Sequence, residues 1–232
     1  MKKNFVKWLM LAGAAILLVA ATIMGTLAYL TSSSAVTNTF TIGNVGIQMF
    51  ETKVNSAGVP VSPVEKVDTN SYHLQPGAKY VKDPTVYVNA NSDISYLFVK
   101  VRNDIRGIEA KSEAGVYTSM VDQVSNNGWI YLGSTFNANV YVYETFVGGV
   151  ATEEDYPIFT EFKIAENADL SLSGGAKVIL TAFAIQKTGF EPATGTGDDA
   201  QAYLTAAHAA WDVLAETYTT ENGDIISTTP IK

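Results

Sequence analysis

Side chains suited to nucleophilic or metal chemistry are scarce in this sequence. It has no cysteine, which excludes thiol catalysis, disulfides and zinc sites built on thiolates. Its two histidines, His73 and His208, are far apart, and no HExxH motif, nucleophile elbow or phosphate-binding loop occurs. We expect His73 in an exposed polar loop and His208 packed at the rim of a helix, rather than either as a metal ligand. These residue types argue against an enzyme.

Carboxylates are the remaining candidates for chemistry. Glu153-Glu154-Asp155 and Asp198-Asp199 form two acidic clusters. Calcium binds to oxygen ligands of this kind, but neither cluster has EF-hand spacing, so we expect solvated surface, with a calcium site as the alternative. Asp83 precedes Pro84, which favours an extended or turn backbone, and we expect its side chain to form a local turn. No other cofactor is expected.

The composition is that of a folded, acidic protein. The chain has 232 residues, of which 47% are hydrophobic and 16% charged, which excludes an intrinsically disordered protein. The net charge is −8, and Arg102 and Arg106 are the only arginines. A nucleic-acid-binding protein needs a basic face, which this sequence cannot supply.

The first 28 residues have the pattern of a secretory signal peptide. Lys2, Lys3 and Lys7 precede an uncharged, mostly apolar run over residues 8–30. Thr26 and Ala28 are small residues at the −3 and −1 positions of a cleavage site between Ala28 and Tyr29. The alternative is a retained membrane anchor, because about 20 apolar residues also span a bilayer. Cleavage would release a chain with 12 basic and 23 acidic side chains.

The rest of the sequence predicts a single β-rich domain over residues 43–232. Short β-branched and aromatic runs alternate with Gly, Pro and Asn turns, as in a two-sheet sandwich with jelly-roll or Greek-key connections. The run 177–187 is apolar on both faces, which is typical of a central strand covered on both sides. The predicted strands lie within residues 39–53, 81–89, 95–102, 129–132, 139–147, 157–164 and 177–187. The fold class is therefore an all-β, jelly-roll-like antiparallel sandwich.

One accessory helix is predicted near the C-terminus, over about residues 198–216. Its apolar residues share one helical face, and we expect this face to lie on the sandwich. Asp198 and Gln201 resemble a capping box at its start. A late strand at 224–227 is the other element expected in the polar tail. The residues of the apolar face are Leu204, Ala207, Trp211, Leu214 and Ala215.

Several stretches, taken in order, resemble the camelysin/TasA family. The first two are Gly25-Thr-Leu-Ala-Tyr-Leu-Thr31 and Asn38-Thr-Phe-Thr-Ile-Gly-Asn-Val45. Further along come Leu74-Gln-Pro-Gly-Ala-Lys-Tyr-Val-Lys-Asp-Pro-Thr-Val86, Ser95-Tyr-Leu-Phe-Val-Lys-Val101, Leu180-Thr-Ala-Phe-Ala-Ile-Gln-Lys-Thr-Gly-Phe190 and Ala209-Ala-Trp211. The segment 103–128 matches no pattern of the family.

The resemblance implies a secreted, non-enzymatic subunit of extracellular fibres in a Gram-positive biofilm matrix. It also implies a jelly-roll fold, export through a SipW-type signal peptidase and assembly with further copies or related fibre subunits. Camelysin itself has been described as a metalloprotease, but this sequence has no metalloprotease motif. In the family, the N-terminal strand freed by signal cleavage completes the sheet of the next subunit.

The N-terminal arm, residues 29–42, has a pattern that suits such an exchange. Its even positions include Leu30, Val36, Phe40 and Ile42, so one face of an extended arm is largely apolar. Adding this strand to another copy would form backbone hydrogen bonds, and a head-to-tail contact that does not close yields a filament. The alternatives are an unstructured leader or a first strand of the chain's own domain.

Two other functions are the alternatives to a fibre subunit. One is a surface metalloprotease, for which the sequence supplies no ligand set. The other is a monomeric adhesin or carbohydrate-binding module with exposed aromatic residues, although Tyr and Trp serve the core more often. The aromatic candidates are Tyr72, Tyr80, Tyr117 and Trp129.

Overall fold

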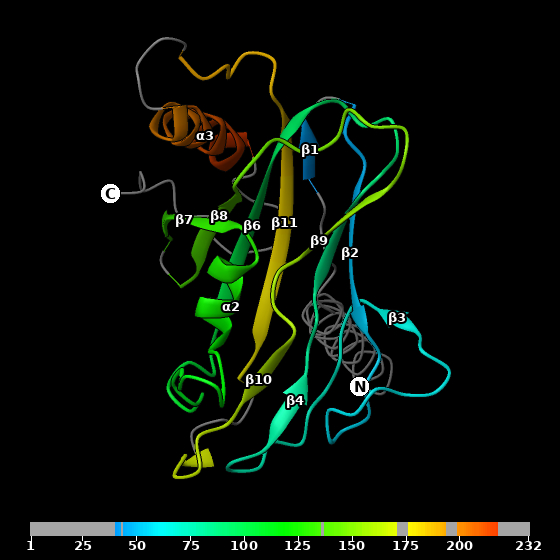
Figure 1. Cartoon of the computed structure of the whole chain (residues 1–232), viewed down its shortest axis with the longest axis vertical. Helices are drawn as coiled ribbons and strands as arrows, with labels where there is room; N and C mark the ends of the chain where they lie inside the picture. The colour runs from blue at the N-terminus through cyan, green and yellow to red at the C-terminus, as the bar shows by residue number, and fades with distance from the viewer. Residues whose placement is uncertain (1–39, 43, 136, 171–175, 194–198, 218–232) are drawn as a thin grey trace, which may run out of the picture. The chain divides into compact units, whose positions relative to one another are not determined.

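The structure, a computed structural model, describes residues 40–42, 44–135, 137–170, 176–193 and 199–217, all within the unit Thr37–Lys232 (Figure 1). Its helices are α2 (Met120–Asn126) and α3 (Asp199–Thr217). Its strands are β1 (Phe40–Ile42), β2 (Ile47–Thr52), β3 (Lys66–Val67), β4 (Lys79–Val81), β5 (Thr85–Val88), β6 (Ser95–Asn103), β7 (Trp129–Ser134), β8 (Asn139–Tyr143), β9 (Glu154–Pro157), β10 (Glu161–Lys163) and β11 (Val178–Gln186).

The larger sheet has the strand order β1-β11-β6-β8-β7. Its two longest strands, β11 and β6, pair antiparallel along all nine residues, from Val178 opposite Asn103 to Gln186 opposite Ser95. At one edge, β1 pairs with β11 in parallel. The other described pairs in this sheet are antiparallel. The β6–β11 pair is therefore the long central ladder of the sheet.

The smaller sheet has the order β3-β2-β5-β9, and a short ladder joins β10 to β4. Alternation in β2 buries Ile47, Met49 and Glu51, while the residues between them are exposed or half-buried. The chain changes sheets between β5 and β6 and between β8 and β9, as connections in jelly rolls and Greek keys do. Inward-facing residues of both sheets thus come from segments far apart in sequence.

Two apolar clusters lie on opposite faces of the larger sheet. One fills the space between the sheets and includes Leu180, Ala182 and Ala184 of β11. The other lies under α3 and includes Phe183 and Ile185 of the same strand. The all-β sandwich with an accessory helix is therefore confirmed, and so is the prediction that β11 is covered on both faces.

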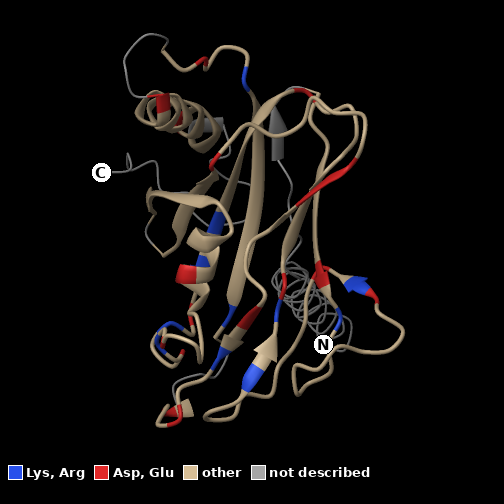
Figure 2. Cartoon of the chain, in the orientation of Figure 1, with Lys and Arg blue, Asp and Glu red and all other residues tan. Residues whose placement is uncertain are grey.

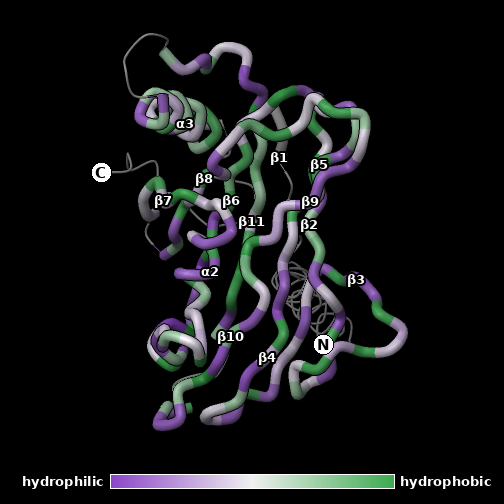
Figure 3. The backbone as a smooth tube through the Cα atoms, viewed as in Figure 1, coloured by the Kyte–Doolittle hydropathy of each residue, from purple (hydrophilic) through white to green (hydrophobic). Residues whose placement is uncertain are grey.

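The helical face predicted for α3 is the face that docks. Ala207, Trp211 and Leu214 are buried in the cluster under the helix, and Leu204 and Ala215 pack against it. Trp211 lies against the rings of Phe98 and Phe183, at centroid distances of 5.5 and 5.3 Å. Figure 3 shows hydrophobic residues along β11 and α3, and Figure 2 shows β11 without charged residues.

Some elements differ from the sequence-based prediction. The strand expected over 139–147 ends at Tyr143, and the run 157–164 is divided between β9 and β10. Gly148 and Gly149, which follow this strand, both have a φ of 79°, in the left-handed region that favours glycine. Helix α2 was not predicted; Ser119 caps its start by accepting a hydrogen bond from the Asp122 amide. The proposed helix cap at Asp198 and the strand at 224–227 lie outside the described residues.

Candidate functional site

The residues considered for enzyme chemistry do not converge. His73 is exposed in a loop, as expected, and His208 is half-buried on α3. Over the ranges that the structure describes, no group of three or more His, Cys, Asp or Glu side chains could hold a metal ion.

The described residues of the acidic clusters face solvent to different degrees. Glu153 and Asp155 are exposed, whereas Glu154 is half-buried and accepts a hydrogen bond from the Gly148 amide at 3.1 Å. Asp199 is exposed, and Asp198 lies outside the described residues. Glu154 thus supports a turn.

The aromatic residues considered for an adhesin surface serve the core instead. Tyr80, Tyr117 and Trp129 are almost completely buried, and Tyr72 is half-buried. Tyr80 stacks on Phe162, with ring centroids 5.0 Å apart. These four side chains therefore provide no exposed binding platform.

The structure describes only part of the N-terminal arm. Ala28 and Tyr29 at the predicted cleavage site, and Leu30 and Val36 of the predicted donor strand, lie outside the described residues. Phe40 and Ile42 are the ends of β1. In the isolated chain, residues 40–42 form a first strand of the chain's own domain, which was one of the alternatives for the arm.

The β1 edge of the larger sheet is the first candidate site. Phe40 is opposite Phe183, Thr41 is opposite Ala184, and Ile42 is opposite Ile185. This pairing uses three of the nine residues of β11. Along residues 178–182, no described strand pairs with β11 on this side.

Along residues 178–182, where no described strand pairs on this side, the side chains of residues 179–182 alternate between half-buried and buried. Leu180 and Ala182 face the cluster between the sheets. Ile179 and Thr181 are half-buried on the opposite face. An unpaired edge presents N–H and C=O groups to any strand that reaches it, so this edge can accept a further length of strand.

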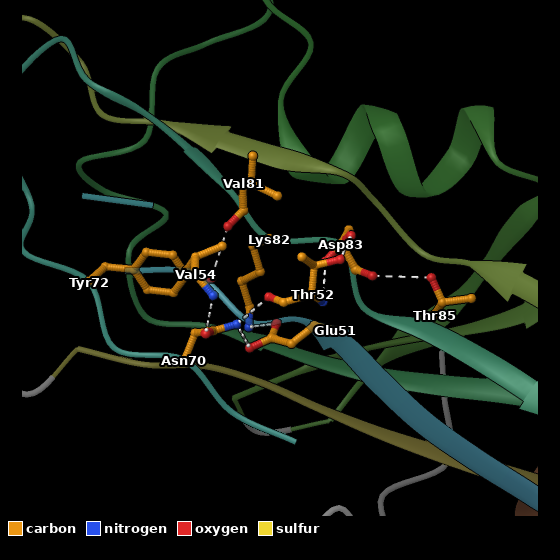
Figure 4. Close-up of polar contacts among 9 residues, drawn as sticks. All are labelled: Glu51, Thr52, Val54, Asn70, Tyr72, Val81, Lys82, Asp83 and Thr85. Carbon is orange, nitrogen blue, oxygen red and sulfur yellow. Dashed lines mark hydrogen bonds and ion pairs between the residues drawn. The ribbon is translucent and has the colours of Figure 1, made fainter. Parts of the chain in front are cut away.

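A second candidate is the triad of Glu51, Asn70 and Lys82, in which Glu51 and Lys82 are buried and Asn70 is half-buried (Figure 4). Lys82 Nζ is 2.6 Å from Glu51 Oε2, and the two side chains are only 9% and 4% exposed. Asn70 Nδ2 donates to the other carboxylate oxygen, Oε1, at 3.0 Å. One buried carboxylate therefore bridges an amine and an amide.

The alternation of side chains along the strands explains why Glu51 and Lys82 face inward. Glu51 follows Ile47 and Met49 at alternate positions, so it faces inward with them. Lys82 follows Tyr80 in the same way after β4. Burying charges costs free energy unless they are paired and hydrogen-bonded. The pairing of Glu51 with Lys82 offsets this cost, and every buried side-chain N or O atom of the described residues has a partner.

Asp83 anchors the segment that carries Lys82. Its two carboxylate oxygens accept hydrogen bonds from the backbone N and the side-chain Oγ1 of Thr52, both at 2.7 Å. The prediction that Asp83 forms a local turn is therefore wrong. Residues 82–84 form neither a turn nor a strand, and the Asp83 side chain reaches β2 instead, 31 residues away in sequence.

The surroundings of the triad are poorly solvated. Burial, followed by the nearby charge of Glu51, raises the pKa of Tyr72 well above its ordinary value. The Tyr72 hydroxyl donates to the Val81 carbonyl at 3.0 Å. The sequence signals for this site are the charged residues Glu51 and Lys82 in alternation with apolar strand residues, and no site was predicted at these positions.

Comparisons with known proteins give no assignment. No family model, curated protein or solved structure matches the chain. Among the helices of the described ranges, none has the length and apolar character needed to cross a membrane.

Proposed function

We propose that this chain is a secreted structural subunit of cell-surface and biofilm-matrix fibres, assembled head to tail by its N-terminal strand after signal cleavage. The observation that carries the proposal is the edge strand β1, which pairs in parallel over three residues with the nine-residue strand β11. A short edge strand at the end of a long arm is suited to exchange between identical copies. A SipW-type signal peptidase would free the arm.

The register of β1 defines what a full exchange would look like. If a neighbour's arm took the same register and continued it, Val36 would lie opposite Ile179 and Asn38 opposite Thr181. The arriving strand would then cover residues 178–182 of β11, which no described strand pairs on this side. The gain would be backbone hydrogen bonds along this edge, together with contacts to the half-buried Ile179.

Charge favours specific docking over general aggregation. After cleavage the chain would carry 12 basic and 23 acidic residues, so copies repel one another at long range. In contrast, β11 contains no charged residue. Association is therefore expected through this edge and not through the charged surface.

Cysteine cross-linking tests the exchange directly, because the natural chain has no cysteine to interfere. Thr41 and Ala184 are register partners, so Thr41→Cys with Ala184→Cys places two thiols on adjacent strands, where Cα atoms lie within disulfide range. We expect a ladder of covalent oligomers from oxidised fibres on a non-reducing gel. Oxidised, unassembled protein should give monomers with an internal disulfide.

The controls separate exchange from other contacts. Thr41→Cys alone should give no ladder beyond dimers. Electron microscopy should show filaments of the chain that starts at Tyr29 and monomers when residues 29–38 are removed. Filaments that persist without the arm, or fibres whose double-cysteine form releases only monomers, would refute the strand exchange.

A further inference from the structure

The triad of Glu51, Asn70 and Lys82 brings a half-buried carboxamide to a buried amine and a buried carboxylate. Lys82 Nζ and Asn70 Nδ2 contact the two oxygens of the same Glu51 carboxylate, at 2.6 and 3.0 Å. Figure 4 shows the three side chains converging from β2, from the loop that follows β3 and from the segment that follows β4. Asn70 satisfies the second oxygen of the buried carboxylate, and it also brings a carboxamide to the same carboxylate that the lysine amine contacts.

The Asn70 carboxamide is held in one orientation. Its Oδ1 accepts a hydrogen bond from the Val54 backbone N–H at 2.9 Å. Its Nδ2 donates both to Glu51 and to the Thr52 carbonyl, the latter at 2.8 Å. The N–H on Oδ1 polarises the carbonyl and is placed to stabilise negative charge on this oxygen during nucleophilic attack on Cγ.

Glu51 is placed to move protons between the amine and the amide. A general acid or base must lie within about 2.6–3.2 Å of the atoms that it serves, and both of its contacts meet this condition. Burial penalises the two charges of the pair. A proton passing from Nζ to Glu51 removes both charges at once and leaves a neutral amine, which is the nucleophilic form of lysine.

We propose that Lys82 and Asn70 condense into an intramolecular isopeptide bond, with Glu51 as the shared base and acid. Lys82 Nζ attacks Asn70 Cγ, the Nζ–Cγ bond forms, and the Cγ–Nδ2 bond breaks. The two protons lost by the lysine ammonium pass through Glu51 to Nδ2, which leaves as ammonium. Glu51 ends as a carboxylate, and no oxidant or second reactant is required.

The fold favours this reaction by holding the groups together. Reacting groups that are positioned in one molecule reach effective concentrations far above those in solution. Asp83 fixes the segment with Lys82 to Thr52 on β2, and β2 carries Glu51. The product would join the loop after β3 covalently to the segment after β4. This inference does not depend on fibre assembly, because the bond lies within one chain.

Mass spectrometry of the folded full-length chain tests the proposal. We expect an intact mass lower than the sequence mass by about 17 Da, the mass of ammonia. After trypsin digestion, residues 67–79 and 80–100 should appear as one branched species that is uncut after Lys82. Asn70→Ala, Lys82→Met and Glu51→Gln should each lack the mass loss, whereas Lys53→Arg, at an exposed lysine, should retain it.

The wild-type digest decides the matter even if the variants fold poorly. Unlinked peptides 67–79 and 83–100 of unmodified mass, from folded protein incubated for days, would refute the bond. A loss of about 18 Da, with Lys82 joined to Glu51, would indicate loss of water and refute the role of Asn70.

Discussion

Replacing Trp211 with alanine tests whether α3 holds the outer face of the larger sheet. Trp211 is 3% exposed and packs on Phe98 and Phe183. A buried tryptophan removes about 200 Å² from water, which corresponds to about 5 kcal/mol at about 25 cal/mol per Å². The alanine methyl retains part of this, so we expect Trp211→Ala to lower the free energy of unfolding by about 3–5 kcal/mol.

The assay is urea denaturation of the unassembled chain, with unfolding monitored by far-ultraviolet circular dichroism. Val213→Ala is the matched control, since Val213 lies two residues away on the same helix and is 39% exposed. Its effect should stay within about 0.5 kcal/mol. A loss below about 1 kcal/mol for Trp211→Ala, with an unchanged denaturant slope, would refute the docking of α3 on the sheet.

Three further predictions follow from individual contacts. Burial, followed by the charge of Glu191, raises the pKa of Tyr96 from 10.0 to about 12. The protonated Tyr96 hydroxyl therefore stabilises the folded state fully below pH 10, and this stabilisation is lost as the pH rises through about 12. The tyrosinate absorbance of folded protein should therefore appear at higher pH than that of urea-unfolded protein. Gly148→Ala should destabilise the fold by about 1–3 kcal/mol in thermal or urea unfolding, because φ is +79° and the added Cβ would lie 2.7 Å from the Asp93 carbonyl oxygen. Asp83→Ala should cost about 2–3 kcal/mol in the same assays, through the lost hydrogen bonds from Thr52.

Each of these predictions has a control in the same chain. Tyr96→Phe should remove one late-titrating group from the absorbance curve, and an unchanged curve would contradict the assignment. Gly189→Ala also has a positive φ but meets no atom within 4 Å, so its cost should be smaller than that of Gly148→Ala. Asp68→Ala, at an exposed position, should change stability by less than about 0.5 kcal/mol. Equal losses of stability for the two glycine variants, or for the two aspartate variants, would contradict the explanation.

The sequence predicted the elements whose apolar pattern is long. Strand β11 shows two apolar faces over nine residues, and α3 shows one apolar face over several turns, so periodicity was sufficient for both. Helix α2 is only seven residues long, which is too short for periodicity to distinguish it. Its cap, Ser119 with Asp122 three residues later, was the available signal.

The candidate sites depended on contacts that a single sequence does not encode locally. Parallel pairing of β1 with β11 joins segments more than 140 residues apart, and nothing in the arm specifies that edge. Glu51, Asn70 and Lys82 come from three segments. The sequence suggested a local turn at Asp83, whereas its partner is on β2.

The double coverage of β11 has a consequence for any strand that adds to its edge. Both faces of β11 are packed, and one side is hydrogen-bonded to β6 over its full length. Its backbone therefore has little conformational freedom left to lose when a partner arrives. The entropic cost of association falls almost entirely on the incoming arm, and an acceptor that is ordered in advance binds more tightly than one that must first become ordered.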